Sequence, residues 1–470
     1  MKIVLITHHF PPNFNAGAEQ YAYRIAKGLY RQGQTIEVVC IESITDGSLT
    51  PVCETDSYEG LTVHRLHFDV RQAPNLFEWS FRNPELGHWT RDFLQRTRPE
   101  VVHINSGYLL GGTVPEAARE LGIPTVLTLH DYWFMCPYIT LLRTDAEICD
   151  GPVSPARCVW CSISQKRCYG LLDKRLGSCL GDAFVRFSQS KRAITMLGVA
   201  PQIEMVKERR AYLKQILDQI DLVIAPSQFA IHKHKEYRFA PPQVVYLPFG
   251  LDKTHLSGPE VDPLPSKLRT ELRIGYLGQF AVHKGVHLLL AAFRRMDRSR
   301  HSCKLILHGN LSGASPYERK LLKIAHDDPD IIVAGPYPNA QVGQVLNGLD
   351  AIVVPSIWYE NRPTVILEAH ATGTPVVAAR LGGMAELLRH GENGLLFEVG
   401  DVKDLARQLQ RLLDEPMLLS RLRKGIQPVP TVEQETATLV SLYESLLPAP
   451  ENAKPRSLTQ ESQSNHCKER

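Results

Sequence analysis

The 470-residue chain has no apolar run long enough to cross a membrane as a helix. Its net charge is only +3 at pH 7, which gives no reason to expect nucleic acid as a partner. The first apolar segment, KIVLIT, passes directly into a polar loop without a small-residue cleavage pattern, so we expect no signal peptide. These features favour a cytoplasmic protein.

Cysteine is also scarce, because ten cysteines in a chain of this length are too few for a disulfide scaffold. Six of the ten fall between Cys136 and Asp218, where the pattern of the surrounding sequence is interrupted. The first four of these, Cys136, Cys149, Cys158 and Cys161, have intervals of 12, 8 and 2 residues. Such spacing is compatible with a structural zinc ion, and unligated thiols and redox chemistry remain alternatives.

Short apolar runs alternate with helical patterns in two separate stretches of the chain. The first stretch contains KIVLIT, QTIEVVCIE, TVHRLHF, PEVVHIN and IPTVLTLHD, and the second contains RIGYLGQF, KLILHGN, DIIVAGP, AIVVPS and PVVAA. The alternation predicts an α/β fold with two Rossmann-like, doubly wound parallel sheets. Ligands of such sheets bind outside the carboxyl ends of the strands, where we place His8, Gly17, His103 and His130.

The predicted domain boundaries follow from these patterns and from changes in composition. Residues 1–255 form the first domain, with a cysteine-rich and basic insertion at about 136–218, and residues 268–430 form the second. The proline-rich segment between them is a predicted linker. Residues 431–447 form a predicted terminal helix, and the polar residues 448–470 form a predicted disordered tail.

Two glutamates, Glu360 and Glu368, lie on either side of a predicted turn between a strand and a helix. Glu360 follows the apolar run LDAIVVPS, and Pro363 favours the first helical position, which places Glu368 about one turn into the helix. The free amides and dipole of a helix start attract phosphate, and the two carboxylates can accept hydrogen bonds from hydroxyls. The pattern suits a nucleotide-sugar, although loop and helix-start acids without any ligand have the same appearance.

The longer segment from Pro355 to Glu386 contains Glu360-x7-Glu368, then AHATGTPVVA, and then Gly382-Gly383. It resembles the E-x7-E signature of the family 4 retaining glycosyltransferases of the two-Rossmann-domain (GT-B) type. LRIGYLGQFAVHKGVHLLL, VYLPFGLD and AGAEQYAYRIAKGLYRQGQTIEVV resemble other parts of this family. The resemblance covers roughly residues 1–445 outside the cysteine-rich segment, and it implies two domains facing across a cleft, with the terminal helix packing back on the first.

The resemblance implies a role for each residue that it matches. In the family, the first glutamate contacts hydroxyls of the donor sugar and the second holds the ribose hydroxyls, which are the roles of Glu360 and Glu368. The family places an arginine and a lysine over the diphosphate, where this chain has Gln279 and Lys284. Glutamine brings no positive charge, so we expect Lys284 to stabilise the leaving group nearly alone.

His130, in TLHDYW, matches the family histidine that faces the donor sugar, and a core histidine satisfied by its neighbour Asp131 is the alternative. Gly17 matches the second glycine of a loop that approaches phosphate, whereas Ala16 replaces the first. The resemblance therefore assigns catalysis to His130, Glu360 and Lys284. The donor-binding residues that it implies are Gly17, Gln279, Lys284, Glu360, Pro363, Thr364, Val365 and Glu368.

The implied reaction is transfer of a sugar, with retention, from a nucleotide-sugar to a saccharide or lipid-linked acceptor in cell-envelope or extracellular polysaccharide synthesis. No metal or other cofactor is required, and Asp328-Pro329-Asp330 is a predicted acidic turn rather than a metal motif. A nucleotide-sugar epimerase on the same fold and a non-catalytic nucleotide-sugar-binding protein are the alternatives. Residues 166–214 contain 11 Lys and Arg against 4 Asp and Glu, which favours either peripheral contact with anionic lipid or a plain solvated face.

Overall fold

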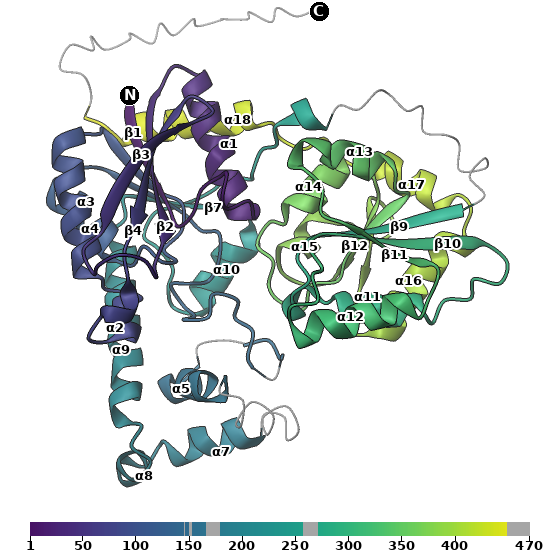
Figure 1. Ribbon diagram of the computed structural model, residues 1–470, viewed down its shortest axis with the longest axis horizontal. Helices are drawn as coiled ribbons and strands as arrows, with labels where there is room; N and C mark the ends of the chain where they lie inside the picture. The colour runs from purple at the N-terminus through teal and green to yellow at the C-terminus, as the bar shows by residue number, and fades with distance from the viewer. Residues whose placement is uncertain (145, 150–152, 166–178, 257–270, 449–470) are drawn as a thin grey trace, which may run out of the picture.

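The computed structural model describes residues 1–144, 146–149, 153–165, 179–256 and 271–448. Two α/β lobes lie side by side, and a helical arm projects from the first lobe (Figure 1). Most of the predicted linker and the predicted tail lie outside the described residues. The prediction of two doubly wound α/β domains is confirmed.

The first lobe is built on a sheet of strand order β3-β4-β2-β1-β5-β6-β7-β8. Its strands are β1 Lys2–Thr7, β2 Thr35–Ser43, β3 Val52–Tyr58, β4 Leu61–His67, β5 Val101–Ile104, β6 Thr125–Thr128, β7 Leu222–Ala225 and β8 Val244–Tyr246. All neighbouring pairs are parallel except β3 with β4. The sequence pattern did not predict β3, because this edge strand is mostly exposed and lacks an apolar face.

Helices cover the faces of this sheet. They are α1 Gly17–Arg31, α2 Leu76–Trp79, α3 Pro84–Thr97, α4 Thr113–Glu120 and α10 Gln228–Glu236. The apolar positions Tyr21, Ile25 and Leu29 of α1 are buried, as their helical spacing predicts. His103 differs from expectation, since it lies inside β5 and bonds to Tyr443 Oη and Thr128 Oγ1. It is a core residue, and burial lowers its pKa to about 3.

The second lobe is built on a fully parallel sheet of order β11-β10-β9-β12-β13-β14. Its strands are β9 Glu271–Leu277, β10 Ser302–His308, β11 Ile331–Gly335, β12 Ala351–Val354, β13 Val376–Ala379 and β14 Gly394–Phe397. Its helices are α11 Val286–Phe293, α12 Pro316–His326, α13 Val342–Asn347, α14 Thr364–Ala371, α15 Gly382–Leu387, α16 Val402–Asp414 and α17 Leu418–Gly425.

Strand order reverses once in each sheet, between β1 and β5 in the first and between β9 and β12 in the second. Loops that leave adjacent strands in opposite directions open a crevice at such a point. His8 and Asn105 follow β1 and β5, while Lys284 and Glu360 follow β9 and β12. The two sheets thus present most of the predicted site residues at their reversal points.

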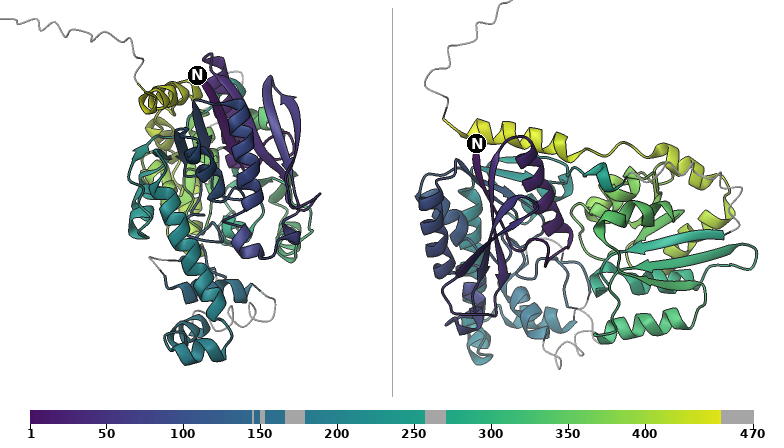
Figure 2. Two further views of the ribbon diagram at one scale, coloured as in Figure 1. Left: turned by 90° about the vertical axis from the view of Figure 1, so that its left-hand side faces the viewer. Right: turned by 45° about the horizontal axis from the view of Figure 1, so that its top comes forward.

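The terminal helix α18, Val432–Leu446, returns to the first lobe and lies along α1 (Figure 2). Tyr21 Oη donates to Glu435 Oε1 over 2.9 Å, and Gln32 Nε2 donates to Thr436 Oγ1 over 2.6 Å. Gly28 permits this approach, because an added Cβ would lie 2.8 Å from Thr436 Cγ2. The described end of the chain therefore crosses from the second lobe back to the first.

The arm consists of α5 Pro155–Ser164, α7 Cys179–Phe187, α8 Lys191–Met196 and the long helix α9 Ala200–Asp218. It is joined to the body through Arg209, whose buried guanidinium donates to Trp133 O and lies 5.1 Å from the Trp133 ring. Trp133 belongs to the loop that follows His130, so the arm supports that loop. Within the described residues no helix is long and apolar enough to span a membrane.

Candidate active site

Glu360 and Lys284 form an ion pair between the loops that leave β12 and β9. Lys284 Nζ lies 2.8 Å from Glu360 Oε1, and Ser356 Oγ and Trp358 Nε1 donate to the same oxygen over 2.8 and 2.9 Å. Burial alone would raise the pKa of Glu360, but Lys284 and the hydrogen bonds outweigh it and hold the pKa below its usual value. Glu360 is therefore a carboxylate held in a fixed position, and its Oε2 takes part in none of these three bonds.

Close backbone contacts hold these two loops in place. Gly285 has φ +70°, and an added Cβ would lie 1.9 Å from Pro355 O. Gly383 N donates to Glu360 O over 2.8 Å, and a Cβ on Gly383 would lie 1.6 Å from Asn361 O. Glycine is needed at both positions because a side chain would push the Glu360 loop out of place. This explains part of the Gly382-Gly383 motif.

Helix α14 begins at Thr364, directly after Pro363, which occupies the cap position rather than the predicted first helical position. No side chain caps this helix, so the first amides, including that of Val365, keep their capacity to bind an anion. Glu368 lies one turn further along α14, and burial raises its pKa while Arg24 lowers it. This arrangement of amides and carboxyl group is the one that the sequence predicted.

Gly17 lies beside this helix start, and Gln279 lies in the loop after β9. Gly17 begins α1 in the first lobe, and a Cβ added to it would lie 3.5 Å from Thr364 Oγ1. Gln279 follows β9, and its carbonyl oxygen accepts a hydrogen bond from Tyr276 Oη over 2.5 Å. The loop of Gly17 therefore reaches the second lobe at α14.

His130 lies at the carboxyl end of β6, in the first lobe. Its Nε2 is 2.7 Å from Asn105 Oδ1, and its ring packs against Tyr21 and Phe249 at centroid distances of 4.6 and 5.1 Å. Burial, followed by the neighbouring charges, lowers the pKa of His130 well below its usual value, so the imidazole is neutral near pH 7. Asp131 is not its partner, since Asp131 instead accepts hydrogen bonds from Ser106 Oγ and Trp133 N.

The sequence placed His8 at the end of a strand but did not pair it with Glu19, with which it forms a second polar pair on the same lobe. His8 Nε2 is 3.2 Å from Glu19 Oε1, and both side chains are buried. His8 Nδ1 and Glu19 Oε2 have no hydrogen-bond partner in the described part of the protein. The Tyr108 ring lies 5.8 Å from the His8 ring. Glu19 falls in the first turn of α1, next to the predicted Gly17 loop, and this proximity was the signal in the sequence that could have pointed to it.

Direct hydrogen bonds connect the two lobes beside the site. Ser227 Oγ donates to Asn361 Oδ1, and Asn361 Nδ2 donates to Leu129 O over 2.7 Å. The Glu386 carboxylate accepts from the first amides of α10, at Gln228 and Phe229. Asn361 follows Glu360 directly, and Leu129 precedes His130. The contact between the lobes therefore aligns the two predicted catalytic loops.

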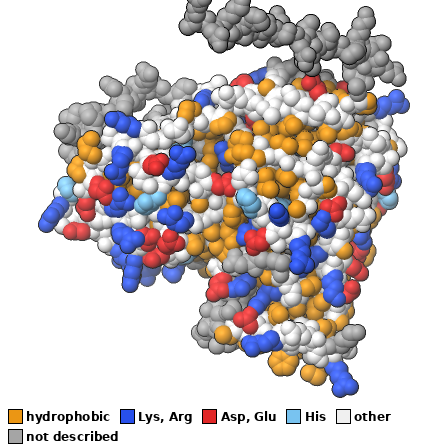
Figure 3. Space-filling view, turned by 180° about the vertical axis from the view of Figure 1, so that it is seen from behind, with side chains coloured by type: hydrophobic (Ala, Val, Ile, Leu, Met, Phe, Trp, Pro, Cys, Tyr) orange, Lys and Arg blue, Asp and Glu red, His pale blue; other side chains and the backbone are white. Residues whose placement is uncertain are grey.

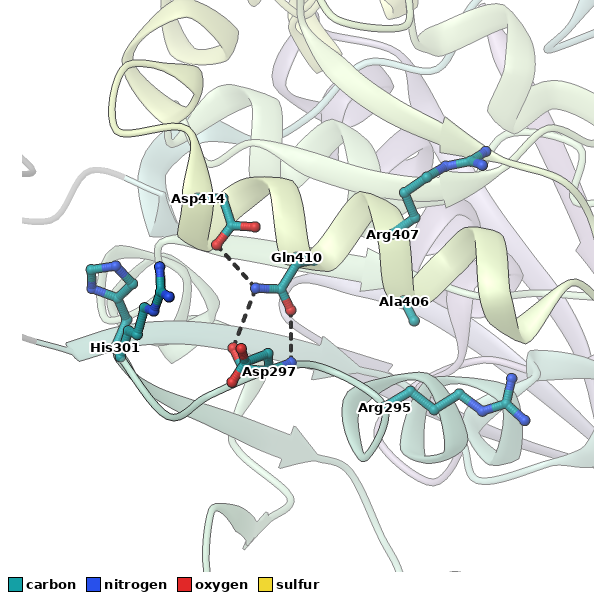
Figure 4. Close-up of a pocket in the computed structure, with 8 residues that line it drawn as sticks. Arg295, Asp297, His301, Ala406, Arg407, Gln410 and Asp414 are labelled. Carbon is teal, nitrogen blue, oxygen red and sulfur yellow. Dashed lines mark hydrogen bonds between the residues drawn. The ribbon is translucent and has the colours of Figure 1, made fainter.

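A shallow depression of about 520 Å³ lies elsewhere, between the start of β10 and helix α16 (Figure 4). Gln410 fills its centre, where it bonds to Asp297 N and O and to Asp414 Oδ1 over 2.9, 3.2 and 3.0 Å. This depression is at the amino end of β10, opposite the reversal point of the sheet. Asp328 and Asp330 also lie near this end and pair with Arg298.

The four cysteines of the predicted zinc site are all reduced and belong to the loop after β6 and to α5. Arg210 Nη2 lies 3.4 Å from Cys158 Sγ, and Tyr237 Oη donates to the carbonyl of Cys149. Burial raises the pKa of Cys136 and Cys161 to about 11 and 12, and the other thiols add to the shift. Within the described residues no three potential ligands are arranged to hold a metal ion, and zinc stays a prediction for elemental analysis of the purified protein.

Comparison with known proteins adds independent observations. Residues 16–161 match the family model described as a glycosyl transferase 4-like domain, and residues 265–427 match the model of glycosyl transferases group 1. A D-inositol 3-phosphate glycosyltransferase of Corynebacterium aurimucosum is 28% identical over 221 residues, which make up 44% of this chain and 52% of the relative. The chain thus spans about half the length of the curated relative it matches.

Two solved structures share the architecture of the whole chain at low sequence identity. Sucrose-phosphate synthase from Thermosynechococcus elongatus has a TM-score of 0.63 and 19% identity, covering 95% of this chain and 98% of that one. Anabaena HepE in complex with UDP and glucose has a TM-score of 0.62 and 18% identity, covering 95% and 100%. With one family model matching each lobe and the GT-B fold across both, this chain belongs to the group 1 glycosyltransferases, the family that its sequence resembles.

Proposed function

We propose that the protein is a retaining glycosyltransferase that transfers a sugar from a nucleotide-sugar to a saccharide or lipid-linked acceptor. The observation that carries this proposal is the Glu360–Lys284 pair beside the uncapped start of α14, joined to the His130 loop of the other lobe through the Asn361–Leu129 hydrogen bond. Amides and a lysine suit the diphosphate, while carboxylates suit sugar and ribose hydroxyls. The HepE structures, which hold UDP and UDP-glucose, support the same ligand class.

The residues suggest how this site lowers the barrier to transfer. Negative charge develops on the diphosphate as the bond to the sugar breaks, and Lys284 and the amides of Thr364 and Val365 stabilise it. Glu360, fixed by three donors, orients the sugar through its hydroxyls. His130 is neutral near pH 7, so it can donate or accept a hydrogen bond without adding charge. No step in this scheme requires a metal.

The test is an assay of nucleoside diphosphate release with UDP-, GDP- and ADP-sugars, each with and without acceptor mixtures. Acceptor-dependent release supports transfer, and NMR of the anomeric proton in the product tests retention. The epimerase alternative predicts a changed sugar without nucleoside diphosphate release. A non-catalytic binding protein would show a thermal shift with one donor and turn over none of them.

We further propose that the arm brings the protein to an anionic membrane, where a lipid-linked acceptor in envelope polysaccharide synthesis would lie. Phe187, Met196 and Leu197 are 66%, 85% and 48% exposed near the turns between α7, α8 and α9. Orange apolar and blue basic side chains lie together at the end of the arm (Figure 3). Exposed apolar groups among basic residues suit insertion between anionic headgroups.

Sedimentation with vesicles tests this membrane contact. The wild-type protein should pellet with phosphatidylglycerol-containing vesicles and less with phosphatidylcholine alone. The double variant Phe187→Ser/Met196→Ser should lose this binding, whereas Met417→Ser, at an equally exposed site on the second lobe, should retain it. Equal pelleting of all three proteins would contradict the proposal.

A further inference from the structure

The donor side of the site has less free positive charge than a nucleoside diphosphate would need. Lys284 is already paired with Glu360 at 2.8 Å, so its charge is largely matched before any ligand arrives. Glu368 adds a second carboxyl group on α14. A diphosphate placed at the start of α14 would therefore meet carboxylates as well as amides, and another cation nearby would stabilise it.

Helix α1 presents a suitable cation to the same place. Arg24 follows Gly17 by seven residues and Tyr21 by three, so the three side-chain positions share one face of α1. This face meets the second lobe where Gly17 lies beside Thr364, and further along the helix Tyr21 packs on His130. Figures 1 and 2 show α1 on the side of the first lobe that faces α14.

The guanidinium of Arg24 has hydrogen-bonding capacity that the protein does not use. Its Nε and Nη2 are inaccessible to solvent and have no hydrogen-bond partner among the described residues. No carboxylate of the described chain pairs with it, since the nearby Glu435 is bonded to Tyr21 and to Gly250 N. Leaving such donors unpaired is costly, which points to a ligand that satisfies them.

The field of Arg24 reaches both halves of the predicted donor site. Burial raises the pKa of Glu368, and the charge of Arg24 opposes this shift. Burial lowers the pKa of His130, and Arg24 lowers it further. Arg24 is therefore within electrostatic reach of the carboxyl group on α14 and of His130 on its own lobe. The other arginine nearby, Arg362, donates through Nη1 to the carbonyl oxygen of Pro226 over 3.4 Å, and its Nε is likewise buried without a partner among the described residues.

We propose that Arg24 is a ligand of the donor diphosphate, supplied by the first lobe to a site otherwise built by the second. This assignment rests on the proposed function. The guanidinium would donate through Nε and Nη2 to phosphate oxygens, a planar two-point contact that lysine cannot copy. Because the ligand would touch both lobes, donor binding would also hold them together beside the Ser227–Asn361 contact.

Calorimetric titration of the full chain with UDP, GDP and ADP, each in turn, tests the assignment. In Arg24→Gln, affinity for the tightest of these ligands should fall about 10- to 100-fold, as expected for lost charge-assisted hydrogen bonds. Arg31→Gln removes an exposed arginine from the end of the same helix and should change the affinity less than two-fold. Thermal unfolding of both variants shows whether the fold is intact.

A second variant separates a ligand contact from a structural role. Gln279→Arg adds a guanidinium at the same edge, five residues before Lys284, and in the Arg24→Gln background it should recover at least part of the lost affinity. If the wild-type protein binds a ligand and Arg24→Gln leaves the affinity unchanged, the assignment of Arg24 is overturned but the proposed function is not. The same holds if Arg24→Gln lowers the affinity and Gln279→Arg does not reduce this loss. A wild-type protein that binds none of the three ligands overturns the proposed function together with the assignment.

Discussion

The two sides of the candidate site, one on each lobe, differ in how far their polar groups are satisfied within the protein. On the second lobe, Glu360 is held by three donors, and glycines fix the loops around it. Among the residues that the structure describes, His8 Nδ1, Glu19 Oε2 and two nitrogens of Arg24 on the first lobe are buried without partners, and so is Arg362 Nε on the second. The Glu360 loop of the second lobe is therefore organised in advance of its ligand, whereas the side chains of the first lobe have donors and acceptors left for one.

This difference fits the proposed reaction, in which one side binds the donor and the other receives the acceptor. A nucleotide-sugar has the same diphosphate and sugar whatever its acceptor, so a fixed set of partners can serve it, with Lys284 at the diphosphate and Glu360 at the sugar hydroxyls. The His8–Glu19 pair is in the first lobe at the carboxyl end of β1, where an acceptor hydroxyl would approach. Substitutions on the two sides should therefore have different kinetic consequences.

The largest effect is expected at the organised side, in Glu360→Gln. This change keeps the shape of the side chain but removes the charge that matches Lys284, and kcat should fall about 100- to 1000-fold, or about 3–4 kcal/mol. Steady-state kinetics with the preferred donor measures it, and Glu398→Gln, an exposed partner of Arg380, is the matched control. A kcat within three-fold of wild type would remove Glu360 from the catalytic residues.

The next effect concerns the stability of the protein and depends on Glu435, which bonds to Tyr21 Oη and Gly250 N in the first lobe. Burial raises its pKa from 4.5 to about 7, so the folded protein binds this proton more tightly than the unfolded chain. The resulting stability is fully present below pH 4.5 and is lost as pH rises through about 7, amounting to about 3 kcal/mol.

Glu435→Gln isolates this contribution, because glutamine can still accept from Gly250 N and donate to Tyr21 Oη. Denaturant unfolding from pH 5 to 8 should show wild type losing stability relative to the variant over this range. Parallel pH profiles for the two proteins would mean that the Glu435 carboxyl is ionised in the folded state throughout.

Glu368→Ala should have a smaller effect, mainly on donor binding. Loss of a carboxylate that accepts from ribose hydroxyls should raise the donor KM about 10-fold, or about 1–2 kcal/mol, with kcat changed less. Glu368→Gln keeps one acceptor oxygen and should lose less than Glu368→Ala. If kcat falls while KM is unchanged, Glu368 acts in the transition state instead, and the two glutamates are less distinct than proposed.

The smallest effect is expected for Asn361→Ala, which removes the bonds that join the lobes at Ser227 and Leu129. The donor KM should rise about three-fold, since about 0.5–1.5 kcal/mol per hydrogen bond is spread over binding and stability. Small-angle scattering should show a larger radius of gyration in the variant. A radius and KM equal to those of wild type would mean that the contact does not help to bring the two sides together.

Sequence patterns determined the second side of the cleft better than the first. Glu360, Pro363, Thr364 and Glu368 are contiguous in one strand–loop–helix unit, so their spacing alone brings them together. The first side combines residues from α1, the ends of several strands and α18, and His103 shows how strand ends can mislead. It lies at the end of an apolar run, yet it is bonded to Thr128 and Tyr443 inside the core.

The sequence by itself determined the α/β class, the two sheets and the anion-binding start of α14, because these depend on local periodicity and on near neighbours in the chain. Only the tertiary structure decided that Lys284 is paired with Glu360, that Asn105 rather than Asp131 bonds to His130, and that two buried nitrogens of Arg24 have no partner in the described part of the chain. Each of these joins residues 25 or more positions apart or depends on what surrounds a side chain. Burial and pairing are properties of the packed fold, which spacing along the chain does not contain.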